Sequence, residues 1–106
     1  MRRVLFICSR NRLRSPTAEN LFAGPGIETD SAGLAPDAEC VLSAEQLEWA
    51  DLIFAMEKQH RVKLKHIFAS SLQGKRVVCL DVPDRYQFMQ PELVELLRQK
   101  VGQYLR

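Results

Sequence analysis

The sequence predicts an α/β fold in which four parallel strands form one sheet with helices on both faces. Short apolar segments, rich in branched and aromatic residues, alternate along the chain with segments of helical periodicity. This alternation is typical of a parallel sheet with crossover helices. Right-handed crossovers make the first strand a neighbour of the third as well as of the second, which predicts the strand order 2-1-3-4. The 106 residues fit one domain spanning positions 1–106.

Local signals place the elements of the N-terminal half. Apolar runs predict strands at 2–7 and 27–31. Between them we expect a helix that begins at Ser15, which suits a cap position, and has Pro16 at its first helical position. The segment 24–26, which reads Gly-Pro-Gly, ends this helix.

The second half of the chain repeats the alternation. Ser43 and Gln46 have the spacing of a capping box and predict a short helix. Strands are expected at 51–56 and 75–80, separated by a basic helix over 57–68 and followed by a last helix from Gln90. His60, Leu64, Ile67 and Phe68 are expected on one face of the basic helix. In the last helix the residues expected to form an inward stripe are Leu93, Leu96, Leu97, Val101 and Tyr104.

Composition and charge exclude several classes of protein. Hydrophobic residues make up 46% of the chain and charged residues 26%, as in ordinary globular domains, and no apolar run has the length of a membrane span. The net charge of +2 gives no reason to expect a nucleic acid partner. Cys8, Cys40 and Cys79 are odd in number and too widely spaced for a zinc site, which favours free thiols in a reducing compartment. We therefore expect a cytoplasmic protein that does not act at a membrane.

The segment from Cys8 to Arg14, called the Cys8 loop below, carries the strongest functional signal. It follows the first strand, so Cys8 lies at the carboxyl end of a strand, where parallel sheets bind their ligands. The loop has no acidic residue and no proline, so its main-chain N–H groups are free to form an anion-binding nest, and the helix N-terminus that follows favours a dianion. These properties indicate a thiol that faces a bound phosphate. The phosphate-binding residues would be Ser9, Arg10, Asn11, Arg12, Leu13 and Arg14.

A second cysteine with the same spacing serves as an internal control. Arg85 follows Cys79 just as Arg14 follows Cys8, but the residues between them include Asp81, Pro83 and Asp84. Carboxylates repel phosphate, and proline has no N–H to donate. The composition of the loop, rather than the spacing, therefore selects Cys8 as a functional thiol over a buried structural cysteine.

The polar residues in and after the Cys8 loop have expected roles. The positive field around Cys8 favours its thiolate, the nucleophilic form. The Arg14 guanidinium suits two phosphate oxygens in a bidentate contact. Ser15 donates to the thiolate, caps the helix, or does both. Asn11 either adopts a left-handed backbone and braces the loop or is an exposed turn residue.

Phosphoryl transfer from an ester also needs a proton donor for the leaving oxygen. Asp84 is the candidate because it follows the fourth strand, at the sheet edge that carries Cys8. Asp81 is the rival, but it lies closer to the strand end and is better suited to bracing a turn. Tyr86 and Phe88 are candidates for an aromatic wall beside a flat substrate group, unless one of them packs beneath the loop.

Three other residues invite a functional reading that the sequence does not support. His60 and His66 lie on the basic helix without an evident acid–base partner, so we expect both to be surface or half-buried residues. Trp49 is expected to pack in the core or to anchor a crossover.

Together these motifs resemble those of the low-molecular-weight protein tyrosine phosphatases. The similarity runs in order along nearly the whole chain. It implies that Cys8 forms a phosphocysteine, that Arg14 and the loop amides bind phosphate, and that Asp84 protonates the leaving group and then activates water. It also implies a supporting network of Asn11, Ser15 and Ser31, and no metal or cofactor. The matching segments are Cys8-x5-Arg14-Ser15-Pro16 with Asn11, Ala18-Glu19, Asp30-Ser31-Ala32-Gly33 and Val82-Pro83-Asp84-x-Tyr86.

The function implied by this resemblance is hydrolysis of aryl phosphate monoesters, above all protein phosphotyrosine, with phosphate or sulfate as a ligand of the loop. The chain departs from the family pattern in being shorter, because between Gly33 and Trp49 it lacks a helix and a connecting segment that typically flank the pocket in that family. Arg10 replaces a small residue, Leu13 a frequent second cysteine, and Arg85 the proline after the acid.

Two alternative functions are weighed beside this one. One is an arsenate reductase on the same scaffold, for which Cys40 or Cys79 would have to resolve the covalent intermediate. The other is a non-catalytic module that has kept the loop and binds an anion or a protein partner.

Overall fold

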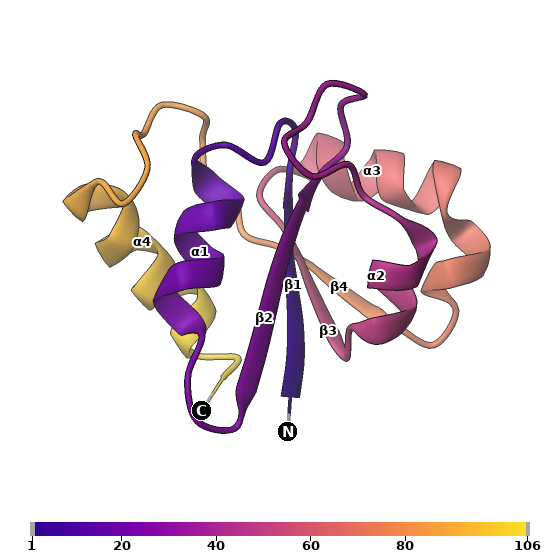
Figure 1. Ribbon diagram of the computed structural model, residues 1–106, viewed down its shortest axis with the longest axis horizontal. Coiled ribbons are helices and arrows are strands. Elements are labelled where there is room, and N and C mark those ends of the chain that lie inside the picture. Colours follow the sequence, from indigo (N-terminus) through magenta and orange to yellow (C-terminus); the bar gives the residue numbers. More distant parts are fainter. Residues whose placement is uncertain (1, 106) are drawn as a thin grey trace.

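The computed structural model describes residues 2–105. Its centre is a four-stranded sheet in which every strand is parallel to its neighbours, in the order β2-β1-β3-β4 (Figure 1). The predicted fold class and strand order are confirmed. Because the strands run in one direction, the segments that follow β1, β3 and β4 meet at one edge of the sheet. The strands are β1 (Arg2–Cys8), β2 (Ile27–Gly33), β3 (Leu52–Ala55) and β4 (Arg76–Cys79).

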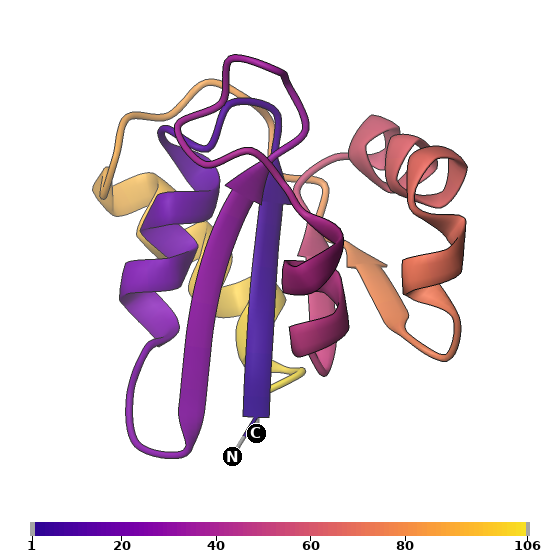
Figure 2. The ribbon, with the colours of Figure 1, turned by 45° about the vertical axis from the view of Figure 1, so that its right-hand side comes forward.

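Helices cover both faces of the sheet, as Figures 1 and 2 show. One face carries α1 (Arg14–Phe22) and α4 (Pro91–Gly102), and the other carries α2 (Ala44–Trp49) and α3 (Lys58–Ile67). A short 3-10 helix, η1 (Ala69–Leu72), connects α3 to the segment before β4. None of the helices within residues 2–105 is long and apolar enough to cross a bilayer.

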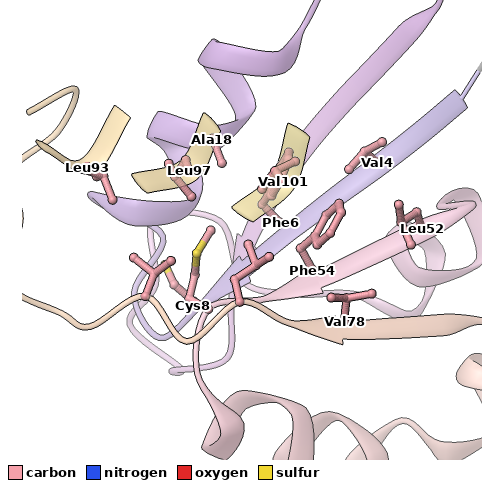
Figure 3. Close-up of a cluster of buried hydrophobic side chains, with 13 residues drawn as sticks. Val4, Phe6, Cys8, Ala18, Leu52, Phe54, Val78, Leu93, Leu97 and Val101 are labelled. Atoms are coloured by element: carbon pink, nitrogen blue, oxygen red, sulfur yellow. The ribbon is translucent and has the colours of Figure 1, made fainter. Parts of the chain in front are cut away.

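The side chains of β1 alternate between the two faces and so build two halves of the core. Val4 and Phe6 pack with Phe54 of β3 beneath α1 and α4, and the Phe6 and Phe54 rings stack with their centroids 5.4 Å apart (Figure 3). Leu5 and Ile7 point to the opposite face, toward α2 and α3. This alternation fixes the register of the strand that ends at the Cys8 loop.

Two predicted details of the helices are wrong. The first helix begins at Arg14 rather than Ser15, because the Ser15 hydroxyl is engaged elsewhere and makes no capping hydrogen bond. Ile67 is 57% exposed, although it was expected to share one face with His60, Leu64 and Phe68. His60 and Leu64 are buried and Phe68 packs against the same half of the core, whereas Ile67, the last residue of α3, has its side chain in solvent.

Candidate active site

The Cys8 loop borders a cavity of about 570 Å³ at the carboxyl edge of the sheet. Cys8 is the last residue of β1 and Arg14 is the first of α1, so a strand end and a helix start hold the two ends of the loop. The segment after β4 brings Asp84 to the same cavity. The lining residues are Cys8, Ser9, Arg10, Arg12, Leu13, Arg14, Ala35 and Asp84.

The sulfur of Cys8 lies where the core meets the cavity and has two polar neighbours. The main-chain N–H of Asn11 donates to Sγ at 3.2 Å, and the Ser15 hydroxyl oxygen lies 2.9 Å from Sγ. These two contacts hold the sulfur at the base of the Cys8 loop. Of the two roles considered for Ser15, the structure has the contact with the thiol and not the helix cap.

The main chain of the Cys8 loop turns its carbonyl groups toward the segment that follows β2. In a trans peptide the N–H points away from the C=O of the same unit. The N–H of Asn11, which shares a peptide unit with the Arg10 carbonyl, accordingly points the other way, to the Cys8 sulfur. The bonds that fix this orientation run from Leu34 N–H to Cys8 O at 3.1 Å, from Ala35 N–H to Ser9 O at 2.8 Å, and from Glu39 N–H to Arg10 O at 3.0 Å.

Asn11 is a buried brace at the centre of the loop, not an exposed turn residue. Its φ of 56° lies in the left-handed region, which asparagine tolerates better than most residues. Its Nδ2 group donates to the Ser15 and Ser31 hydroxyls at 2.9 Å each, and the Ser31 hydroxyl donates to Glu19. The expected network of Asn11, Ser15 and Ser31 is thus present, extended by the α1 residue Glu19.

Arg14 carries a buried positive charge beside the cavity. Its side chain is only 4% exposed. Nη1 donates to the Val82 carbonyl oxygen at 2.8 Å and to the Glu57 carboxylate, while Nε lies 3.8 Å from a carboxylate oxygen of Asp84. The guanidinium is therefore held from the side of the β3 and β4 ends.

The acidic and aromatic residues after β4 separate in space. Asp84 lines the cavity with a side chain that is 65% exposed, whereas Asp81 has a φ of 55° and accepts from the Cys79 thiol at 3.5 Å. Tyr86 packs against the core beside α4 and Phe88 is exposed, and neither lines the cavity. The expected wall of Tyr86 and Phe88 is therefore not formed, because the segment turns toward α4 after Asp84.

Two residues at the start of α3 contact the Cys8 loop, and the sequence analysis missed both. Glu57 follows β3 at the same edge as Cys8 and pairs with Arg14. His60, expected near the surface, is 2% exposed, with Nε2 at 2.8 Å from the Ser9 hydroxyl oxygen. The signal in the sequence that could have identified Glu57 is its position directly after a buried strand.

The hydrogen bonds of His60 define its neutral tautomer. The Glu57 main-chain N–H donates to Nδ1 at 3.1 Å, so Nδ1 is the acceptor and Nε2 carries the proton that goes to Ser9. Burial, followed by the nearby positive charge of Arg14, lowers the pKa of His60. His60 is thus a neutral support for the start of the loop.

The arginine side chains at the rim of the cavity pair with the segment after β2. Arg10 lies 3.9 Å from Asp37, and Arg12 lies 3.3 Å from Glu39. All four side chains are more than half exposed, so these pairs contribute little to stability. Their consequence is electrostatic, because they set the charge that an approaching substrate meets.

The other two cysteines lie apart from this chemistry. Cys40 is exposed beside Gln46, and Cys79 contacts Asp81. In the described part of the chain, no three His, Cys, Asp or Glu side chains come together as a metal site.

Comparison with known proteins gives a consistent result at the level of structure. No protein-family model and no curated protein sequence matches this chain. Among solved structures, a YwlE mutant from Bacillus subtilis is 25% identical with a TM-score of 0.72, covering 100% of both chains. The low molecular weight protein tyrosine phosphatase of T. tengcongensis is 24% identical with a TM-score of 0.69, covering 96% of this chain and 94% of its own.

A third similar structure was solved with a ligand. The tyrosine phosphatase Wzb from Escherichia coli K30, in complex with phosphate, is 21% identical with a TM-score of 0.78, covering 96% of this chain and 94% of its own. YwlE arginine phosphatases are also among the similar structures. The chain thus shares, over its whole length, the fold of the low-molecular-weight protein tyrosine phosphatases that its motifs resemble.

Proposed function

We propose that this protein is a cysteine-dependent phosphatase that hydrolyses aryl phosphate monoesters, with protein phosphotyrosine as its substrate class. One observation carries the proposal: Cys8 and Arg14 line the same cavity, and the main-chain N–H of Asn11 points to the Cys8 sulfur. A nucleophile, anion donors and a fixed cation at one point are what phosphoryl transfer requires. The fold shared with known phosphatases supports the same reaction class.

The reaction proceeds in two displacements. The Cys8 thiolate attacks phosphorus, the S–P bond forms as the P–O bond to the aryl group breaks, and protonated Asp84 gives its proton to the leaving oxygen. Arg14 and the loop N–H groups hold the equatorial oxygens. Asp84, now a carboxylate, takes a proton from water, which attacks the phosphocysteine and releases inorganic phosphate and the thiolate. The Ser15 hydroxyl, 2.9 Å from Sγ, stabilises the thiolate as it leaves.

The charge at the rim favours phosphotyrosine over phosphoarginine. Arg10 and Arg12 line the cavity together with Arg14, and Asp84 is the acidic residue among the lining side chains. A phosphoarginine substrate would bring a guanidinium group beside Arg10, Arg12 and Arg14, whereas a phosphotyrosine ring is uncharged. The pairing of Arg10 with Asp37 and of Arg12 with Glu39 reduces this difference. The cavity lining includes no aromatic side chain, so we expect the phosphoryl group, rather than the ring, to supply most of the affinity.

Turnover of para-nitrophenyl phosphate tests the proposal. Cys8→Ser should be inactive because a hydroxyl is not ionised near neutral pH, and Asp84→Asn should lower kcat by about 100-fold or more. Wild type should release phosphate faster from a phosphotyrosine peptide than from a matched phosphoarginine peptide. A wild-type protein that binds phosphate but turns over none of these substrates would refute the catalytic function and leave an anion-binding module.

A further inference from the structure

Glu57 lies between the end of β3 and the start of α3 and contacts the one cation that the proposed reaction requires. Its carboxylate accepts from Nη1 of Arg14, and its other oxygen accepts from the Gln59 side-chain amide at 3.1 Å. The Glu57 side chain is 30% exposed, whereas that of Arg14 is 4% exposed. The partly exposed Glu57 carboxylate therefore holds the buried Arg14 guanidinium in place.

Counting the donors of Arg14 shows what this contact leaves free. A guanidinium has five N–H groups in one plane. The two on Nη1 are used by Glu57 and by the Val82 carbonyl oxygen. The remaining three belong to Nε and Nη2, which share one edge of the plane and have the geometry for bidentate contact with a phosphate. Occupation of Nη1 thus decides which edge of Arg14 is presented to the ligand.

The carboxylate of Asp84 makes the orientation of the Arg14 guanidinium dependent on Glu57. Asp84 lies 3.8 Å from Nε, on the edge that the phosphate would use. A buried guanidinium that loses one charged partner is destabilised and moves toward what remains. Without Glu57, the remaining carboxylate near Arg14 in the described structure is Asp84, and pairing with it would block the ligand edge and engage the proposed acid.

The main chain of Glu57 is anchored as firmly as its side chain. Its N–H donates to Nδ1 of His60 at 3.1 Å, and Nε2 of His60 lies 2.8 Å from the Ser9 hydroxyl oxygen. The start of α3 therefore contacts both ends of the Cys8 loop, at Ser9 and at Arg14. The main chain that carries the Glu57 side chain is therefore held in place next to the Cys8 loop, so the carboxylate can orient the guanidinium.

We propose that Glu57 is a positioning residue that holds Nη1 of Arg14 and thereby presents the Nε and Nη2 edge to the phosphoryl group. This inference rests on the proposed function for its catalytic consequence, but it makes a separate claim about oxyanion binding. Glu57 touches neither the substrate nor the reacting atoms.

Three substitutions at this position separate geometry from charge. Glu57→Ala removes both the acceptor and the charge, Glu57→Gln keeps an acceptor oxygen without the charge, and Glu57→Asp keeps the charge but withdraws the carboxylate by one methylene. Lys58→Ala, at the exposed neighbouring position, is the matched control. For each variant, calorimetry with inorganic phosphate gives the dissociation constant, and para-nitrophenyl phosphate turnover gives kcat and KM. Melting temperatures report folding.

Positioning predicts a specific order among the variants. Glu57→Ala and Glu57→Asp should weaken phosphate binding and lower kcat/KM by about tenfold or more, whereas Glu57→Gln should stay within about threefold of wild type. If Glu57 acts only as a nearby negative charge, Glu57→Ala and Glu57→Gln would both bind phosphate more tightly and Glu57→Asp would match wild type, which would overturn the inference. A change in melting temperature alone, with phosphate affinity and turnover intact in all three variants, would overturn it as well.

The two readouts also keep the inference apart from the proposed function. If wild type binds phosphate without turnover and Glu57→Ala weakens that binding, the phosphatase function fails while the positioning role stands. If wild type turns over and Glu57→Ala does so equally well, the positioning role fails while the phosphatase function stands. Should Glu57→Ala not fold, the comparison of Glu57→Asp with Glu57→Gln carries the same test.

Discussion

Gly33 lies so close to the main chain of Ser9 that a β-carbon added to Gly33 would be 2.5 Å from the Ser9 carbonyl oxygen. The same β-carbon would be 2.7 Å from the side chain of Ala38. Gly33 ends β2 and pairs in register with Cys8, so the last residue of one strand abuts the start of the Cys8 loop. Glycine is required here for space, because only a residue without a β-carbon lets the two segments approach this closely.

Substitution of Gly33 should therefore distort the Cys8 loop. We expect Gly33→Ala to lower the free energy of unfolding by about 1–3 kcal/mol, as overpacking does, and to reduce kcat/KM because the loop N–H groups move. Gly102→Ala, at a position where an added β-carbon has no neighbour within 4 Å, is the control. Urea denaturation and para-nitrophenyl phosphate turnover measure the two effects. Equal behaviour of the two variants would contradict the packing explanation.

Asn11 should be sensitive to replacement by alanine for two independent reasons. Alanine is disfavoured at a φ of 56°, and it cannot donate to the Ser15 and Ser31 hydroxyls. We expect Asn11→Ala to cost about 1–3 kcal/mol of stability and to reduce turnover further by releasing Ser15 from its position beside Cys8. Asn20→Ala, an exposed position on α1, should change neither. A fully active Asn11→Ala protein would mean that the loop does not need this brace.

The buried His60 should make stability depend on pH. Its pKa is lowered in the folded protein by burial and by Arg14, whereas the pKa of a histidine in an unfolded chain is about 6.5. As the pH falls below that value, the unfolded chain binds a proton that the folded protein resists. The free energy of unfolding therefore decreases with falling pH until the lowered folded-state pKa is passed.

His60→Gln measures this contribution directly. The difference in unfolding free energy between pH 7.5 and 5.5 (roughly one unit on either side of free histidine) should be smaller in His60→Gln than in wild type. His66→Gln, an exposed position on the same helix, serves as the control. An unchanged pH dependence in His60→Gln would assign the effect to other groups.

Lys75 should stabilise the fold without affecting the site. Its Nζ group donates to the main-chain oxygens of Glu48 at 2.8 Å and Ala50 at 2.6 Å, which closes the C-terminal end of α2. Lys75→Met should lower the free energy of unfolding by about 1 kcal/mol and leave kcat/KM unchanged. Lys65→Met, which lies on the exposed face of α3, should change neither quantity. A loss of turnover in Lys75→Met would reveal a coupling between α2 and the Cys8 loop.

Regular elements were predictable because their signals are local. The two-residue alternation of Val4 to Ile7 and the capping box of Ser43 and Gln46 depend only on neighbours in the chain. The strand order also followed, because the handedness of crossovers restricts how four such strands pair. The start of α1 was not predictable, because the hydroxyl that suits a cap is drawn to Cys8 instead.

The predicted aromatic wall of Tyr86 and Phe88 is absent from the cavity, again because of contacts between residues that are distant in sequence. Tyr86 and Phe88 stand at the right distance along the chain from Asp84, but Tyr86 buries its ring against the core beside α4. Where a chain turns after a strand depends on which apolar surface is available to its side chains, and that surface is made by elements distant in sequence.

By itself the sequence determined the parallel sheet, the thiol at the end of its first strand, and a loop free of acids and prolines. Those features follow from periodicity and from the composition of a few consecutive residues. Only the tertiary structure decided that Glu57 and His60 hold the two ends of that loop, 43 and 51 positions away from their partners Arg14 and Ser9. Such contacts arise because parallel strands bring distant segments to one edge of the sheet. Residues that are neighbours in the sequence do not indicate which side chains will meet there.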